Sequence, residues 1–205
     1  MLAFTSPGVQ SSLVVKSAAT IRPGDRISVG REASLIVPRL YLANLYTAQD
    51  PEQLAALGVT HIVSVVEGIP KLPKSMPHLK TLHIPITDSH DADILQYLNR
   101  TTAFIKGALA EDPKNVVLVH CLVGMSRSAT VVCAYLTATT SMVPSEAIGF
   151  VATKRCIVSP NPGFRQQLDE YAVRYHPKLE RAQGGTTKES GGIVERLRSW
   201  NRRAT

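Results

Sequence analysis

The most constraining stretch of this chain is VVLVHCLVGMSRSATVVCAYL, which runs from Val116 to Leu136. The run from Val116 to Val119 is apolar and mostly β-branched, which predicts a buried strand. An almost uninterrupted apolar run from Ala129 to Leu136 predicts a helix that enters the core. The residues between them begin with His120-Cys121 and contain Gly124. This stretch therefore predicts a loop that joins the end of a strand to the start of a helix.

Such a loop has the chemistry of an anion site. The first N–H groups of a helix have no partner within the helix and converge on the preceding loop, where they attract negative charge. The same partial positive charge stabilises a thiolate at Cys121 and can lower a cysteine pKa to roughly 3.5–7.5. The guanidinium of Arg127 can bind two oxygens of one phosphate. Nucleophile, anion cradle and cation thus share one loop, which predicts phosphoryl transfer without a metal or another cofactor.

The spacing His120-Cys121-(five residues)-Arg127-Ser128 resembles the signature loop of the cysteine-dependent protein tyrosine phosphatases. Gly124 together with Ser126-Arg127-Ser128-Ala129-Thr130 makes the loop most similar to that of the dual-specificity phosphatases. The resemblance extends in family order over about residues 33–175. It implies an α/β fold with a central, mostly parallel twisted sheet flanked by helices, in one domain with flexible tails. No rhodanese-like docking domain or cysteine-rich zinc domain accompanies the match, so we expect a small, atypical member.

The resemblance also implies roles for the loop residues. Cys121 is the expected nucleophile, and Arg127 is expected to hold the equatorial oxygens of the phosphate. The N–H groups that complete the cradle belong to Leu122, Val123, Gly124, Met125, Ser126 and Arg127. Ser128 is expected to donate a hydrogen bond to the sulfur, and an N-cap role is the alternative. His120 is expected to orient the loop and to favour the thiolate through hydrogen bonds.

A leaving serine, threonine or tyrosine oxygen needs a proton, so an acid must lie beside the loop. The segment from His83 to Ser89 is similar to the general-acid loop of the family, and Asp88 occupies the matching place. Asp91 and Asp93 compete for this role, but we assign them to helix capping. Sites in open α/β sheets lie beyond the carboxyl ends of the strands, so Asp88 is expected to face the signature loop across one crevice.

Two further features lie near the end of the predicted domain. Ser159-Pro160-Asn161 followed by Gly163-Phe164 resembles a family segment whose Asn helps to hold the signature loop. An ordinary Pro-Asn turn is a compatible interpretation of Asn161. Arg155 is expected either to offer a second contact to phosphate or acidic residues, or to be a solvated surface charge.

The rest of the sequence predicts alternating strands and helices, as in an α/β domain with a largely parallel sheet. The predicted strands cover residues 34–37, 40–42, 59–66, 81–86 and 116–119. The predicted helices cover residues 48–57, 94–109, 129–136, a short segment that opens at Pro144, and 164–175. The helix at 94–109 is expected to be capped by Asp91-Ala92-Asp93.

The domain is expected over residues 31–176. Residues 1–30 show no clear period and are expected to be a disordered extension, and residues 177–205 form a basic tail. In that tail Ile193, Val194, Leu197 and Trp200 fall on one helical face among arginines. This pattern gives a weak expectation of contact with a partner or an anionic membrane, and a frayed terminus is the favoured alternative. No apolar run approaches the length of a membrane span.

The net charge of +7 lies mainly in the two ends of the chain. Between residues 31 and 175, 13 Lys and Arg stand against 12 Asp and Glu, so a nucleic-acid partner is not expected. The three cysteines, Cys121, Cys133 and Cys156, match no zinc or disulfide framework, which favours reduced thiols and a cytoplasmic or nuclear location. Cys133 is expected in the core. A disulfide between oxidised Cys121 and either of the others is a less favoured alternative.

The leading hypothesis is a protein phosphatase for phosphotyrosine and phosphoserine or phosphothreonine, with phosphorylated proteins as its partners. A phosphatase for lipid or RNA 5′-phosphates on the same scaffold is an alternative that basic surroundings would favour, but residues 122–126 contain no Lys or Arg. A non-catalytic phosphate-binding signalling module would be expected to lack the cysteine, the arginine or the acid, and all three are present. A sulfurtransferase would have no use for the Asp88 segment.

Overall fold

The computed structural model describes residues 32–176, and its centre is a five-stranded sheet. The strands are β1 (Ser34–Val37), β2 (Leu40–Ala43), β3 (His61–Val65), β4 (Lys80–Ile84) and β5 (Val117–His120). They lie in the order β1-β2-β5-β3-β4, with β1 antiparallel to β2 and every other neighbouring pair parallel. The predicted, mostly parallel sheet is therefore confirmed, and the strand that leads into the signature loop is its middle strand.

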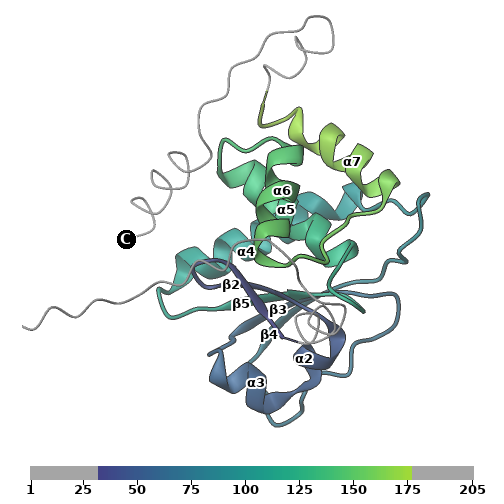
Figure 1. Cartoon of the computed structure of the whole chain (residues 1–205). Helices are drawn as coiled ribbons and strands as arrows, with labels where there is room; N and C mark the ends of the chain where they lie inside the picture. Colours follow the sequence, from purple (N-terminus) through teal and green to yellow (C-terminus); the bar gives the residue numbers. More distant parts are fainter. Residues whose placement is uncertain (1–31, 177–205) are drawn as a thin grey trace, which may run out of the picture.

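Helices cover both faces of this sheet (Figure 1). Their bounds are α2 (Leu45–Gln49), α3 (Pro51–Ala56), α4 (Leu95–Glu111), α5 (Arg127–Thr139), α6 (Pro144–Lys154) and α7 (Pro162–Ala172). Helices α4 to α7 lie on one face, and α2 and α3 lie on the other. Each face has its own hydrophobic cluster, and alternate residues of β5 enter them: Val117 and Val119 join the larger one, and Leu118 the smaller.

Helix α5 is the element on which the larger layer is built. Every residue from Arg127 to Thr137 is buried, because α5 lies between the sheet and helices α4, α6 and α7. The helix begins at Arg127, two residues before the predicted start at Ala129. Its first turn therefore carries the last two residues of the signature motif, and the N-terminus of a buried helix points at the loop.

The prediction of a single helix over residues 48–57 is wrong, because the chain forms two short helices there. Asp50 separates α2 from α3, and its Oδ1 accepts hydrogen bonds from the backbone N–H groups of Glu52 (2.9 Å) and Gln53 (3.2 Å). Pro51 follows at the first helical position, where its missing N–H costs nothing. An N-cap next to a proline therefore starts a new helix.

The ends of α4 and α7 also differ from the predictions. Of the two aspartates assigned to capping, Asp93 accepts a hydrogen bond from Gln96 N (3.2 Å), whereas Asp91 is exposed and pairs with His90. The backbone N–H groups of residues 94 and 95, at the start of α4, instead donate hydrogen bonds to Oε1 of Gln167 in α7. Helix α7 begins two residues earlier than predicted, because Asn161 caps it by accepting from the N–H of residue 164 (2.9 Å).

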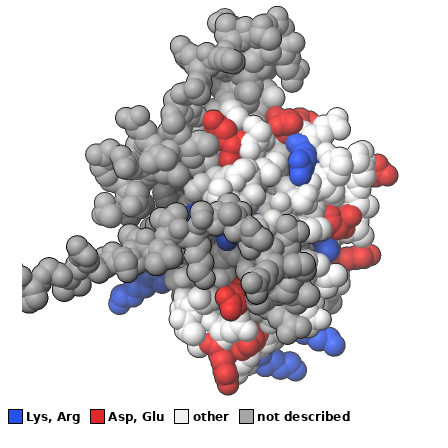
Figure 2. Space-filling model, viewed as in Figure 1, with Lys and Arg blue, Asp and Glu red and all other residues white. Residues whose placement is uncertain are grey.

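Charged side chains of both signs are interspersed on the face of the described residues seen in Figure 2. Within residues 32–176, no helix combines the length and the apolar character needed to cross a membrane. The expectations for the N-terminal extension and for the amphipathic face in the basic tail concern segments outside the described residues.

Candidate active site

Cys121 follows directly after β5, and its side chain lies at the bottom of the loop. The residue is only 1% exposed. Its Sγ accepts hydrogen bonds from the backbone N–H of Gly124 (3.2 Å) and from the hydroxyl of Ser128 (3.1 Å). Burial raises the pKa of the Cys121 thiol, but the hydrogen bonds from Ser128 and Gly124 and the charge of Arg127 outweigh it, so the pKa lies below its ordinary value. The site therefore favours a thiolate.

The hydroxyl of Ser128 makes the hydrogen bond to sulfur that the resemblance implied. Ser128 is the second residue of α5, so the alternative, in which it caps that helix, is wrong. The N-cap position belongs to Ser126, whose side chain makes no capping hydrogen bond.

The loop can turn around the sulfur only because residue 124 is glycine. Gly124 has φ +77°, in the left-handed region that side chains rarely adopt. A Cβ there would lie 2.5 Å from the carbonyl oxygen of Ala43 and 2.8 Å from Nη2 of Arg155. The backbone of β2 and a buried guanidinium therefore press against the loop at this point.

We expect Gly124→Ala to lower the free energy of unfolding by about 1–3 kcal/mol, from the unfavourable φ and the close contacts. Urea denaturation measures this loss. The matched control is Gly107→Ala in the exposed interior of α4, where a Cβ meets nothing within 4 Å. That control is expected to gain roughly 0.5–1 kcal/mol, as alanine does in a helix. Equal stabilities of the two variants would contradict the tight fit at Gly124.

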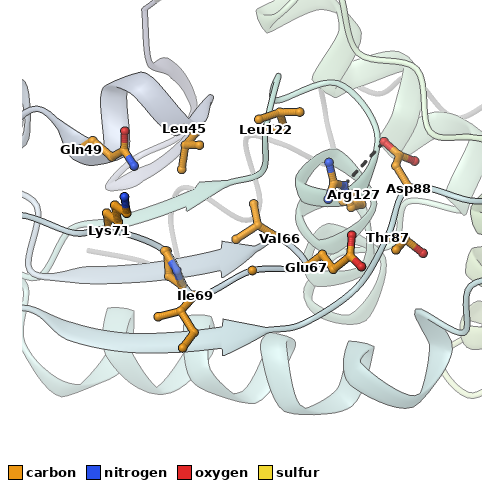
Figure 3. Close-up of a pocket in the computed structure, with 12 residues that line it drawn as sticks. Leu45, Gln49, Val66, Glu67, Ile69, Lys71, Thr87, Asp88, Leu122 and Arg127 are labelled. Atoms are coloured by element: carbon orange, nitrogen blue, oxygen red, sulfur yellow. Dashed lines mark ion pairs between the residues drawn. The ribbon is translucent and has the colours of Figure 1, made fainter.

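Arg127 is 9% exposed, and its side chain reaches toward the loop after β4 (Figure 3). Its Nη1 donates to the carbonyl oxygen of Ile86 (3.1 Å), and its Nε lies 3.7 Å from Oδ2 of Asp88. Within the described residues, the buried Nε has no hydrogen-bond partner. Buried donors almost always have a hydrogen-bond partner, so a buried donor without one indicates a partner that binds from outside the protein. An oxygen of a bound anion would be such a partner for Nε.

Asp88 faces the signature loop, as its place in the sequence led us to expect. It lies four residues beyond the end of β4, and its Oδ1 accepts hydrogen bonds from Ser126 Oγ (2.7 Å) and from Asn161 Nδ2 (2.9 Å). The competing aspartates bind elsewhere: Asp93 accepts a hydrogen bond from Gln96 N in the first turn of α4, and Asp91 pairs with His90. The carboxyl of Asp88 is therefore fixed beside the loop that carries Cys121.

Asn161 joins the acid loop to the signature loop. Its backbone N–H donates to Ser126 Oγ (3.1 Å), while its side chain binds Asp88 and caps α7. The start of α7 presses directly on the acid loop, because a Cβ at Gly163 would collide with the carbonyl oxygen of His90. From the sequence, Ser126 is expected to contribute only its backbone N–H to the anion cradle. No local pattern shows that the Ser126 hydroxyl binds residues 38 and 35 positions away.

His120 is buried and orients the start of the loop. Its Nε2 lies 2.7 Å from the hydroxyl of Ser64, and its Nδ1 lies 3.4 Å from the carbonyl oxygen of Cys121. The pKa of His120 is lowered to about 4, mainly by burial; the bond to the Cys121 carbonyl opposes this shift, and the nearby His83 adds a smaller lowering effect. The ring is therefore neutral near pH 7. One neutral tautomer satisfies both contacts, with Nδ1–H donating and Nε2 accepting.

The expectation that Arg155 is a solvated surface charge is wrong. The side chain is 0% exposed, and its guanidinium binds the back of the signature loop. Nε donates to the carbonyl oxygen of Gly124 (2.9 Å), and Nη2 donates to that of Val123 (3.1 Å). Nη1 donates to the carbonyl oxygen of Glu32 (2.8 Å). These donors hold loop carbonyls turned away from the sulfur, while the N–H of Gly124 faces it.

The other two cysteines lie in different surroundings. Cys133 is buried in α5, as predicted, and burial raises the pKa of its thiol. Cys156 is exposed, and all three cysteines are free thiols. Within residues 32–176, no group of His, Cys, Asp or Glu side chains has the arrangement of a metal site.

A groove of about 560 Å³ begins at this site and runs along the surface. Arg127 and Asp88 line one end of it (Figure 3). The remaining walls come from α2, from the segment that follows β3 and from the loop, and they comprise Leu45, Gln49, Val66, Glu67, Gly68, Ile69, Pro70, Lys71, Thr87 and Leu122.

The part of the chain that holds Cys121, Arg127 and Asp88 is similar to known proteins. The family model for the dual specificity phosphatase catalytic domain matches residues 40–174. The chain belongs to the dual-specificity phosphatases. The match spans every strand from β2 to β5 and every helix described here, so it covers both the signature loop and the acid loop of this phosphatase domain.

Individual relatives agree with the family match. Rat (Rattus norvegicus) dual specificity protein phosphatase 15 is 35% identical over 153 residues, which are 75% of this chain and 63% of that protein. Zebrafish (Danio rerio) dual specificity protein phosphatase 22-B is 36% identical over 143 residues, 70% of this chain and 75% of that protein. The crystal structure of DUSP15 is 32% identical with a TM-score of 0.67, covering 78% of this chain and 99% of that one. The chain thus spans less than two thirds of the length of the rat relative.

Proposed function

We propose that this dual-specificity phosphatase domain hydrolyses phosphotyrosine and phosphoserine or phosphothreonine in proteins through a cysteinyl-phosphate. One observation carries the proposal: the Cys121 sulfur, which accepts hydrogen bonds from Ser128 and Gly124, shares its loop with Arg127, whose Nε has no hydrogen-bond partner within the described residues, and Asp88 is hydrogen-bonded to that loop. Nucleophile, charge stabiliser and acid are thus within one site. The names of the relatives support protein substrates.

In the first step, the Cys121 thiolate attacks phosphorus. A sulfur–phosphorus bond forms, the bond from phosphorus to the ester oxygen breaks, and Asp88 gives that oxygen its proton. Arg127 and the loop N–H groups bind the equatorial oxygens, on which negative charge is spread in the transition state.

In the second step, water attacks the cysteinyl-phosphate. Asp88 takes a proton from the water, the sulfur–phosphorus bond breaks, and inorganic phosphate is released. The hydroxyl of Ser128 stabilises the departing thiolate through the hydrogen bond it already makes. Because the reaction needs Cys121 reduced, we propose that the protein works in the cytoplasm or the nucleus.

A panel of substrates tests the proposal. Purified protein should hydrolyse phosphotyrosine and phosphothreonine peptides with higher kcat/KM than phosphoinositides or 5′-triphosphorylated RNA. The alternatives with lipid or RNA substrates are not favoured, because Arg127 is the only Lys or Arg between residues 121 and 128. Higher kcat/KM for a lipid or an RNA than for every peptide would overturn the proposal of a protein substrate.

We expect Asp88→Asn to lower kcat/KM for a phosphothreonine peptide by about 10²-fold or more, since an alkoxide leaves poorly without a proton. An aryl phosphate whose leaving group is already acidic should lose much less in the same kinetic assay. The control is Asp91→Asn, an exposed carboxylate whose ion-pair partner within residues 32–176 is the neighbouring histidine. It should behave as wild type. An equal loss on both substrates would argue against proton donation by Asp88.

We expect Ser128→Ala to raise the pKa of Cys121, because it removes a hydrogen bond that stabilises the thiolate. The thiolate is lost as pH falls through this pKa. The acidic limb of the profile of kcat/KM against pH, and of Cys121 alkylation by iodoacetamide, should therefore move to higher pH. An unshifted limb would contradict the role of Ser128.

A further inference from the structure

We propose that the groove beside the site binds the residues that flank the phosphorylated residue of a protein substrate, with a large apolar side chain in its middle and an acidic residue at Lys71. This inference rests on the proposed phosphatase function and adds to it a substrate class. The groove's volume of about 560 Å³ lies within the range of known ligand sites, roughly 300–1,000 Å³.

The groove has two polar ends and an apolar middle. Figure 3 shows Arg127 and Asp88 at one end and Lys71 with Gln49 at the other. The apolar side chains that line the space between these ends are Leu45, Val66, Ile69 and Leu122. A phosphate bound at Arg127 therefore directs the adjoining part of its chain over apolar surface toward Lys71.

The apolar middle is open to solvent. Ile69 is 89% exposed and Leu122 is 53% exposed, although both are large hydrophobic residues. Grouped exposed apolar side chains beside a polar site mark a binding surface. The wall beneath them is fixed, because His83 Nε2 lies 2.9 Å from the carbonyl oxygen of Val66 and ties this segment to β4. A leucine or similar side chain of a substrate would cover this surface.

The charges that line the groove determine which substrate residue fits its Lys71 end. Lys71 is exposed, and no ion pair is found for it within the described residues, whereas Lys80 binds Glu111 at 2.8 Å. Glu67 lines the same groove and lies toward the Arg127 end in Figure 3. A substrate carboxylate is therefore repelled near the phosphate and attracted at the far end.

The same distribution favours a peptide over a lipid headgroup. A headgroup with several phosphates needs several cations around one point. Here the two cations that line the groove, Arg127 and Lys71, lie at opposite ends, with the carboxylates of Glu67 and Asp88 also in the lining. An extended peptide spans roughly 3.3–3.6 Å per residue, so it can place its phosphate at Arg127 and a carboxylate several residues away at Lys71.

The experiment measures kcat/KM for phosphotyrosine peptides that differ at one flanking position at a time, on each side of the phosphotyrosine. Wild type should prefer Leu to Ala by about 3-fold or more at a near position. At a farther position it should prefer Glu to Lys by about 2- to 5-fold at low salt, with the preference falling as salt rises. In Lys71→Glu the Glu/Lys ratio should invert.

The matched control is Lys74→Glu, because Lys74 is exposed on the same loop but does not line the groove. It should keep the wild-type Glu/Lys ratio. If aryl phosphate and peptides are hydrolysed but Lys71→Glu keeps the wild-type ratio, the groove assignment is overturned and the phosphatase function stands. A preference for phosphoinositides that disappears in Lys71→Glu would assign the groove to a lipid and also overturn it. Absence of any hydrolysis would overturn the proposed function itself.

Discussion

Cys121→Ser is expected to lower kcat for phosphopeptide hydrolysis by on the order of 10⁴-fold or more. The cradle stabilises a thiolate, whereas a serine hydroxyl in the same place stays protonated near pH 7 and is a weak nucleophile. The neutral ring of His120 does not act as its base, because that ring is occupied by Ser64 and the loop backbone. The measurement is steady-state kinetics with aryl phosphate and with phosphopeptides.

The same variant should still bind oxyanions, since Arg127 and the loop N–H groups remain. Calorimetric titration with vanadate or tungstate measures this binding, and retained binding shows that the variant has lost catalysis rather than its fold. Cys156→Ser is the matched control, because Cys156 is exposed, and it should retain wild-type turnover. A Cys121→Ser protein with more than about one tenth of the wild-type kcat would rule out sulfur as the nucleophile.

Arg127→Lys is expected to lower kcat/KM by about 10³-fold, although the charge is conserved. The guanidinium binds the carbonyl oxygen of Ile86 through Nη1, and its Nε has no hydrogen-bond partner within the described residues, so it can hold the acid loop and a phosphate oxygen together. A lysine ammonium is a point charge without this planar fork. The loss should appear mainly in kcat, because charge accumulates on the equatorial oxygens in the transition state.

Arg100→Lys on the exposed surface of α4 provides the control for the substitution itself, and it should leave kinetics and stability unchanged. Thermal unfolding of Arg127→Lys should remain cooperative, so that the kinetic loss reports geometry rather than unfolding. If kcat/KM of Arg127→Lys falls by less than about 3-fold, a role for the guanidinium in holding the acid loop and a phosphate oxygen together is untenable.

The parts of the fold that the sequence predicted are those in which the signal is local. The strand ending at His120 and the buried helix beyond it are apolar runs, so their type could be deduced without knowledge of their neighbours. The acid segment was located by resemblance, and the parallel arrangement of β3, β4 and β5 brings its Asp88 to the same edge of the sheet as Cys121. The break between α2 and α3 also has a local signal, Asp50-Pro51, which periodicity alone did not resolve.

Other contacts have no local signal, because they join residues that are distant in sequence. Arginine is usually a surface residue, yet Arg155 is buried against the carbonyl groups of a loop about 31 positions earlier. Ser126 connects Asp88 with Asn161 through its hydroxyl, across 38 and 35 positions. Both depend on how α6 and α7 pack against the loop, which only the assembled fold determines.

The proposed mechanism depends above all on the cysteinyl-phosphate. In Asp88→Asn an aryl phosphate with an acidic leaving group should still transfer its phosphoryl group, while the hydrolytic water lacks its base, so the intermediate should accumulate. Acid quenching during turnover, followed by proteolysis and mass spectrometry, should find one phosphoryl group on Cys121. A phosphoryl group on any other residue, or unmodified Cys121 in an enzyme that has released a burst of the phenol, would contradict the mechanism.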